Sequence, residues 1–531
     1  MTLKVVVAGT AAAAVANTIG DLVADKVASR IAAKDFTLWG KDAEAESSIR
    51  LGWVTSPFDS SPLVESILAL KSEFSEKGIV RFVLCGMGGS SLAPEVITRT
   101  AGVELVVLDS TDSDQVGSAL AGDLSKTAVI VSSKSGSTVE TDSQKRVFEK
   151  AFTDAGIDKT DRIVVVTDPG SPMEQAAKAD GYRVFNADPT VGGRYSALTA
   201  FGLVPSGLAG ADIATLLRDA QEVAELLSRD SDQNPGLVLG AALARTPGEM
   251  GNRDKIGIVA DGTHIVGFGD WAEQLIAEST GKQSKGVLPV VLEPRSAELH
   301  SGLADLLAIH VQSDAKPVAG DAVSVSGPLG AQFMLWEFAT VVASRLIGIN
   351  PFDQPDVESA KIAARGMLEQ RDEVVSPLFS ADSIEVRANE LEISGSSISD
   401  ALQSLLQKLD DDEGYVSIHA YLDRTSVPEA AELRDLIANK TRRPVTFGWA
   451  PRFLHSTGQY HKGGPRQGIY LQIVSQAQQD IQVPGRDFSF GELIASQAAG
   501  DAKVLGALGR PVLTLTLADA KAGIAAIKNA I

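Results

Sequence analysis

The chain has 531 residues, 44% of them hydrophobic, which is enough to bury several cores of a globular protein. A formal net charge of −20 and a pI near 4.8 exclude the broad positive surface that nucleic acid or an anionic membrane would bind. The single cysteine, Cys85, cannot form an internal disulfide, and we expect it to be a buried thiol in a reducing compartment. Because no run of about eighteen strongly apolar residues occurs, we predict no membrane span and a cytoplasmic location.

The first 50 residues predict a strand followed by a helix. Residues 3–8 include three consecutive valines and read as a strand, Gly9 marks a turn, and an alanine-rich stretch then reaches about residue 33. Apolar side chains recur in that stretch at helical spacing, at Ile19, Leu22, Val23 and Val27. We therefore expect an N-terminal strand-helix extension over residues 1–50.

From about residue 78 onward, short β-branched runs alternate with helical stretches. The first series predicts strands at 79–85, 103–108, 128–132, 163–167 and 182–185. The second predicts strands at 256–259, 287–292 and 308–311, and then a long apolar helix at 333–346. After a charged stretch at about 381–389, the third predicts strands at 415–421, 445–449, 469–473 and 512–517.

Continuous apolar strands that alternate with helices are typical of a parallel sheet covered on both faces. The fold class that we predict is α/β, with tandem doubly wound parallel-sheet domains and an additional C-terminal α/β unit. The expected boundaries are residues 51–235, 236–380 and 381–531.

Hydroxyl side chains crowd the turn that follows the predicted strand at 128–132. Five of them occur within nine residues, with Lys134 among them: Ser133, Ser135, Ser137, Thr138 and Thr141. Because the next segment is helical, unpaired backbone N–H groups and the helix dipole add to these donors. An ordinary Ser/Thr helix cap would need one hydroxyl. The turn therefore predicts a metal-free cradle for a phosphomonoester.

A second turn, Gly86-Met-Gly-Gly-Ser-Ser91, follows the strand at 79–85 and imitates a dinucleotide-binding fingerprint. Asp109 lies some twenty residues later, as that fingerprint requires, but Ser91 occupies the place of its third glycine. There is no Walker A lysine motif either. Of the six histidines, only His455 and His461 have a spacing that suits a metal, so we expect no cofactor and no metal.

Taken together, Gly86-Met-Gly-Gly-Ser90, the 133–141 turn and Gly192-Gly-Arg-Tyr-Ser196 resemble the glucose-6-phosphate isomerase family. That family is built from paired sugar-isomerase (SIS) domains. Residues 278–282, ESTGK, resemble its catalytic-glutamate segment, with Gln274 one turn earlier. Residues 350–361, NPFDQPDVESAK, resemble its lysine-bearing segment. The five segments follow the family order over residues 80 to 365.

These residues also suit the chemistry. Aldose-ketose isomerisation passes through an enediolate and needs a carboxylate base and a nearby cation, for which we expect Glu278 and Arg194. On helices, Gln274 would share a face with Glu278, and Gln354 would share one with Glu358 and Lys361. For each charged residue alone, a solvated helix face is the alternative. The substrate-binding residues that we expect are Gly89, Ser90, Ser133, Lys134, Ser135, Thr138, Thr141, Gln274 and Gln354.

The resemblance also implies a histidine that acts with Lys361 in opening the sugar ring. Two candidates remain. His300 occupies the expected place in chain order but has a weak motif, ELHS, whereas His455 has the fuller motif LHSTGQY but follows the lysine segment. We favour His455 and interpret His461 as a surface or supporting group.

The sequence thus predicts an isomerase of glucose 6-phosphate and fructose 6-phosphate in glycolysis and gluconeogenesis. We expect a sugar phosphate as its ligand and a homodimer as its assembly. A mannose-6-phosphate or dual-specificity isomerase is an alternative, because sequence does not resolve a C2 epimer. A non-catalytic sugar-phosphate sensor is another, and the presence of Glu278, Arg194 and Lys361 argues against it.

Overall fold

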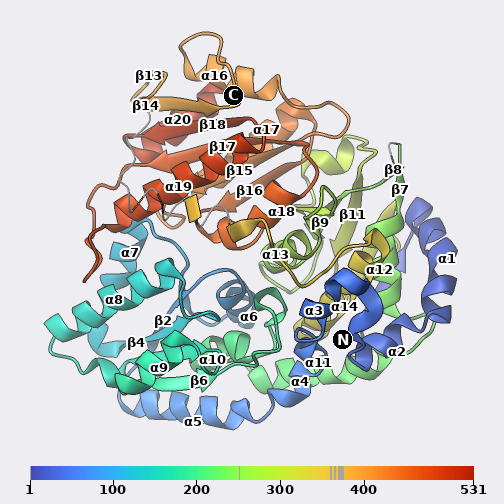
Figure 1. The fold of residues 1–531 in the computed structure, drawn as a ribbon, viewed down its shortest axis with the longest axis horizontal. Helices are drawn as coiled ribbons and strands as arrows, with labels where there is room; N and C mark the ends of the chain where they lie inside the picture. The colour runs from blue at the N-terminus through green and yellow to red at the C-terminus, as the bar shows by residue number, and fades with distance from the viewer. Residues whose placement is uncertain (1, 250, 359–361, 364–365, 367, 369–375) are drawn as a thin grey trace.

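The computed structural model describes residues 2–249, 251–358, 362–363, 366, 368 and 376–531. Its strands form three large sheets, one for each predicted α/β series (Figure 1). A small hairpin of β7 (Pro247–Gly248) and β8 (Gly251–Asn252) lies outside them. The described residues include no helix that is long and apolar enough to cross a membrane.

The first sheet is entirely parallel, as predicted, in the order β3-β2-β4-β5-β6. Its strands are β2 (Arg81–Gly86), β3 (Val106–Leu108), β4 (Thr127–Ser132), β5 (Ile163–Thr167) and β6 (Arg183–Asn186). Gly86 pairs with Ser132 at the carboxyl ends of β2 and β4. The glycine turn and the hydroxyl-rich turn therefore begin side by side, at the carboxyl ends of two neighbouring strands.

Helices cover both faces of this sheet, because alternate side chains of its strands belong to different apolar clusters. Leu84 and Ile130 pack with α5 (Leu63–Glu76), α6 (Leu92–Ala101) and α10 (Ala200–Ala209). Cys85 and Val131 pack with α7 (Ser113–Leu120), α8 (Val139–Asp154) and α9 (Pro172–Ala179). Cys85 is a buried free thiol, as expected.

The second sheet has the order β1-β12-β11-β9-β10. Its strands are β1 (Lys4–Val7), β9 (Lys255–Ala260), β10 (Leu288–Leu292), β11 (Leu306–Val311) and β12 (Ala322–Ser326). All pairs are parallel except β1 with β12. β1, the strand of the N-terminal segment, thus belongs to the second sheet and pairs with β12. The sequence analysis did not predict β12.

The other described helices before the third unit are α1 (Gly9–Ala24), α2 (Val27–Ala32), α3 (Glu44–Ser47), α4 (Ser56–Asp59), α11 (Ile213–Leu227), α12 (Pro235–Arg245), α13 (Phe268–Thr280) and α14 (Leu329–Ile347). Of these, α1, α12 and α13 contact strands of the second sheet, and α11 and α14 pack against α12. The single N-terminal helix that we expected is interrupted between α1 and α2, where Lys26 adopts a left-handed conformation with φ 54°. That conformation cannot continue an α-helix.

The third sheet has the order β13-β14-β18-β17-β15-β16. Its strands are β13 (Phe379–Ala381), β14 (Ile384–Asn389), β15 (Tyr415–Tyr421), β16 (Val445–Trp449), β17 (Gly468–Ser475) and β18 (Val512–Leu517). The charged stretch at 381–389 therefore belongs to this sheet, where β14 lies antiparallel to both β13 and β18. The helices of this unit are α16 (Ile398–Leu406), α17 (Glu432–Thr441), α18 (Gly458–Gly463), α19 (Phe490–Ala507) and α20 (Ala520–Ala530).

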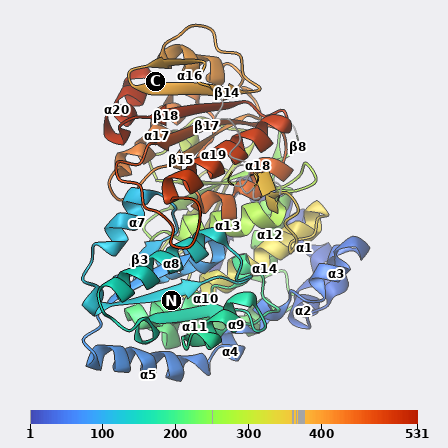
Figure 2. The same cartoon turned by 60° about the vertical axis from the view of Figure 1, so that its left-hand side comes forward.

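The third unit is packed into the other two and is not a separate appendage (Figure 2). Val483 and Phe490 are fully buried in the apolar cluster beneath α7 and α8 of the first unit. Tyr415 and Tyr460 join Val259 of the second sheet in another cluster. Figure 1 shows α18 beside α13, and these two helices are in contact.

Candidate active site

The glycine turn is shaped by close approach to other segments. Gly88 has φ +53°, and a Cβ there would lie 2.6 Å from the carbonyl oxygen of His455. A Cβ on Gly89 would lie 2.1 Å from the carbonyl oxygen of Gly193. Only glycine allows these contacts. The turn therefore brings together the Arg194 segment and the His455 segment, while Ser90 stays buried beside them.

The hydroxyl-rich turn leads from β4 into α8, as predicted. Ser133 Oγ lies 3.1 Å from Thr138 Oγ1 and accepts from the N–H of Gly136. Ser135 Oγ lies 3.1 Å from Ser137 Oγ. Thr138 is the residue before α8 but its side chain does not cap the helix, and the buried Thr141 Oγ1 has no hydrogen-bond partner among the described residues. The hydroxyl groups of the turn thus lie close to one another, next to a helix N-terminus that Thr138 does not cap.

Lys134 of this turn is not a free cation. Its Nζ donates to Asp168, which follows β5. Burial lowers the pKa of the lysine and raises the pKa of the aspartic acid, each opposed by the charge of its partner. The pair therefore holds the turn against the end of β5.

Glu278 and Arg194 form a buried ion pair. Arg194 Nη1 lies 3.1 Å from Glu278 Oε1, and the two side chains are 3% and 10% exposed. Gln274, one turn earlier on α13, donates from Nε2 to Glu278 Oε2 at 3.1 Å. The face of α13 that we predicted to carry Gln274 and Glu278 is therefore present, and it presents a carboxylate next to a cation.

The Arg194 guanidinium is held by several other acceptors. Nε donates to Ser279 Oγ at 2.8 Å, and Nη1 donates to Gln354 Oε1 at 2.8 Å. Nη2 donates to the carbonyl oxygens of Pro351 and Asp353. Gln354 thus joins the cluster, but it lies in the loop before the helix, so our expectation that it shares a helical face with Glu358 is wrong. Pro355 follows it, and a residue before proline is disfavoured in a helix.

His455 lies in the same cluster. Its carbonyl oxygen accepts from Gln274 Nε2 at 2.8 Å, and its Nε2 lies 2.9 Å from Glu140 Oε1. Glu140 is in the first turn of α8, directly after the hydroxyl-rich turn. Gln274 therefore links Glu278 to His455, and Glu140 links His455 to the predicted phosphate cradle. Glu278, His455 and the cradle come from three different units.

The remaining residues that the sequence analysis discussed are His300, His461 and Lys361. His300 is exposed at the end of a 3₁₀ turn, and its side chain has no hydrogen bond or ion pair with any residue that the structure describes. His461 is 1% exposed and its Nε2 lies 3.3 Å from Ser417 Oγ, so of the two interpretations that we gave, a surface or a supporting group, the surface group is wrong. Lys361 lies outside the described residues.

The sequence analysis missed several residues of the cluster. Lys282 is fully buried and donates to Asp353 Oδ1 at 2.7 Å and to the carbonyl oxygens of Asn350 and Asp353. Burial, and then the charge of Arg194, lower its pKa to about 8. Gln459 donates to the carbonyl oxygen of Gly281 at 2.9 Å. Both lie inside the motifs that we quoted, but which partners they bind depends on the fold.

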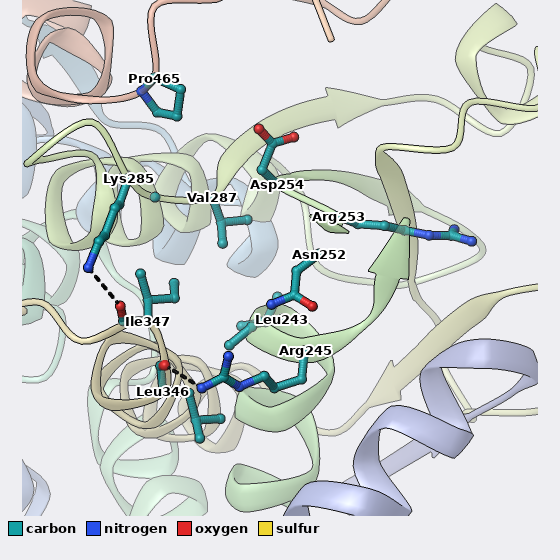
Figure 3. A pocket seen from close by; sticks show the side chains of 12 residues that line it. Leu243, Arg245, Asn252, Arg253, Asp254, Lys285, Val287, Leu346, Ile347 and Pro465 are labelled. Carbon is teal, nitrogen blue, oxygen red and sulfur yellow. Dashed lines mark hydrogen bonds between the residues drawn. The ribbon is translucent and has the colours of Figure 1, made fainter. Parts of the chain in front are cut away.

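Two cavities lie outside this cluster. One, of about 260 Å³, is at the carboxyl ends of α12 and α14, where Arg245 and Lys285 donate to the carbonyl oxygens of Leu346 and Ile347 (Figure 3). The other, of about 300 Å³, lies between α13 and β16 and includes Glu273. Among the described residues, no group of three or more His, Cys, Asp or Glu side chains could hold a metal ion.

Residues 67–302 match the family model of phosphoglucose isomerase. The chain is 30% identical over 364 residues to a probable glucose-6-phosphate isomerase of Natronomonas pharaonis, covering 59% of this chain and 83% of that protein. It is 36% identical over 211 residues to a probable glucose-6-phosphate isomerase of Haloarcula marismortui, covering 39% of this chain and 48% of that protein.

Two solved structures share the fold. A hypothetical protein of Thermus thermophilus, TT0462, aligns with a TM-score of 0.59 and 24% identity over 69% of this chain and all of that chain. A glucose-6-phosphate isomerase of Chlamydia trachomatis aligns with a TM-score of 0.51 and 18% identity over 63% of this chain and 75% of that chain.

Proposed function

This chain belongs to the phosphoglucose isomerase family, and on that premise we propose that it interconverts glucose 6-phosphate and fructose 6-phosphate without a cofactor. The observation that carries the proposal is the convergence of Glu278, Arg194 and His455 beside the hydroxyl-rich turn. A base, a cation and a second acid-base group are what ring opening followed by proton transfer requires.

The phosphate group binds at the start of α8. The N–H groups of the first helical turn and the hydroxyls of Ser133, Ser135 and Thr138 supply donors, and the helix dipole favours an anion there. In a chain of net charge −20, this local geometry attracts the anion, because no general positive field does so.

Ring opening uses His455. Its Nε2 faces the Glu140 carboxylate, which as an ionised group can only accept, so Nε2 carries a proton and Nδ1 is the acceptor toward the sugar. The carboxylate also stabilises the imidazolium that forms when Nδ1 takes the hydroxyl proton. The family role of Lys361 in this step stays a prediction.

Proton transfer between the two sugar carbons uses Glu278. The carboxylate takes the proton from one carbon and returns it to the other, while Arg194 stabilises the negative charge of the enediolate. Because Arg194 also donates to Ser279, Gln354 and backbone carbonyls, its position does not depend on Glu278 alone. Low exposure strengthens these electrostatic interactions.

The test is a coupled assay of the purified protein with fructose 6-phosphate, with and without EDTA, together with exchange of the C2 proton into deuterated water. We expect turnover that is insensitive to EDTA and a loss of about 10²- to 10⁴-fold in Glu278→Gln, with substrate affinity nearly unchanged. Glu273→Gln, on the same helix but outside the Arg194 cluster, is the matched control and should keep its activity.

Near wild-type turnover of Glu278→Gln would refute the assignment of the base. Binding of the sugar phosphate without any proton exchange by the wild-type protein would instead favour a sensor. Mannose 6-phosphate in the same assay decides the C2 specificity, for which a glucose-specific site is the expected result.

A further inference from the structure

We propose that Gln497 is a positioning residue that holds the Glu140 carboxylate against His455, so that the third unit supplies both the ring-opening histidine and the group that orients its partner. The inference rests on the proposed role of His455. Gln497 lies on α19, and neither our sequence analysis nor the five family-like motifs include it.

Thr111, Gln497 and Glu140 form a chain of hydrogen bonds that ends at His455, and we call this chain the relay. Gln497 Nε2 donates to Glu140 Oε1 at 2.7 Å, and the same oxygen lies 2.9 Å from His455 Nε2. Thr111 Oγ1, after β3 of the first unit, donates to Gln497 Oε1 at 2.7 Å. Gln497, Glu140 and Thr111 are 4%, 5% and 0% exposed. The relay therefore joins α8, α19 and the loop after β3 out of contact with bulk water.

The relay fixes which way the amide points. The Thr111 hydroxyl donates to the amide oxygen, so the amide nitrogen must face Glu140. Because the amide and the imidazole share one carboxylate oxygen, the amide competes with His455 for the negative charge on that oxygen. It favours the ionised carboxylate and also limits how strongly that carboxylate stabilises a protonated His455. Gln497 thereby keeps the His455 imidazole able both to accept and to donate a proton.

A second buried glutamine in the same unit has a different setting. Gln472 on β17 is 0% exposed and donates to Asp501 Oδ2 at 3.1 Å. Asp501, however, is paired with Lys462 and lies 3.3 Å from His419, not in the His455 cluster. Gln472 is therefore a matched control for the loss of a buried amide bonded to a carboxylate.

The other charged groups around the relay that the structure describes have partners of their own. Asp142 on α8 pairs with Arg146 and Arg486, and Glu278 on α13 pairs with Arg194. Arg452, beside His455, pairs with Asp109 and Glu95. Asp501 on α19 pairs with Lys462. Asp112, next to Thr111, is a different case, because burial raises its pKa to about 6. Asp112→Asn must therefore be included wherever a pH profile is compared.

The experiment compares Gln497→Leu, Gln472→Leu and Asp112→Asn in the full-length protein. The titration of His455 is followed by NMR, and kcat/KM is measured against pH on ring-closed substrate and on an analogue that cannot cyclise. Removal of the amide should raise the titration midpoint of His455 by about half to one pH unit. It should also lower kcat/KM about tenfold more for the ring-closed substrate than for the open one.

Gln472→Leu and Asp112→Asn should leave the His455 midpoint where it is in the wild type. If Gln497→Leu does not fold, Thr111→Val tests the same relay, because it frees the amide to turn and should move the midpoint in the same direction. An unchanged midpoint in the folded variant, or an equal change in the Gln472 control, overturns the inference. The titration needs no turnover, so an inactive wild-type protein would contradict the proposed function separately.

Discussion

Replacement of His455 by alanine decides whether the third unit takes part in catalysis. The side chain is 16% exposed, and its one hydrogen bond to the side chain of a described residue is the 2.9 Å contact with Glu140. Glu140 keeps its bond to Gln497 when the imidazole is removed, so the stability cost should be about 1 to 2 kcal/mol. The cost to ring opening should be larger, because a positioned acid-base group contributes about 10²- to 10⁴-fold.

The assay measures the same two substrates as above, one ring-closed and one that cannot cyclise. We expect His455→Ala to lose about 10²- to 10⁴-fold on the first and less than about tenfold on the second. His300→Ala, which removes an exposed histidine, is the control and should behave as wild type on both.

A fully active His455→Ala enzyme would refute this reasoning, above all if His300→Ala were defective only on ring-closed substrate. The third unit would then be a structural addition. Point variants are the appropriate tool, because removal of the whole third unit would expose the core around Val483 and Phe490 and test folding rather than chemistry.

Two further predictions concern the phosphate turn and Lys282. Thr138→Ala removes a hydroxyl that lies 3.1 Å from Ser133 Oγ, and it should weaken substrate and inorganic phosphate binding by about 1 to 2 kcal/mol while changing kcat less; unchanged affinities would move the phosphate elsewhere. The pKa of Lys282 is lowered from 10.5 to about 8, so the unfolded chain binds more protons between those values and the free energy of unfolding should rise as pH rises from about 8 to 10.5. Denaturant titrations at several pH values should show that rise in the wild type and not in Lys282→Met, and an equal rise in both would contradict it.

The strands that carry the site could be predicted because their hydrophobic runs are continuous. A strand buried on both faces leaves a run such as 128–132 that turn residues interrupt sharply. The charged stretch that contains β14 is different, because buried and half-exposed side chains alternate there and leave no continuous hydrophobic run, and we therefore did not predict this strand. The pairing of β1 with β12 was beyond reach for another reason, since no local pattern specifies a partner so far along the chain.

The predicted site residues come together where a motif fixes local geometry. Gln274 and Glu278 could be placed on one face because four residues span one helical turn. Gln354 could not, because Pro355 keeps it out of the helix that we expected. Glu140 and Gln497 were missed because an ordinary helical glutamate and glutamine become linked to His455 only when the fold brings α8, α19 and the 3₁₀ turn Arg452–His455 together.

The pairing of β1 with β12 affects how the chain is made. Val7 pairs with Val323, so β1 cannot complete its ladder until more than three hundred further residues have been added. At about 5 to 20 residues per second, that interval is roughly 15 to 60 s. During it, β1 presents unpaired backbone N–H and C=O groups, which can bind the edges of other nascent chains. The first sheet, whose strands all lie between Arg81 and Asn186, can meanwhile form early, and chaperones that shield β1 would govern the yield of the folded protein.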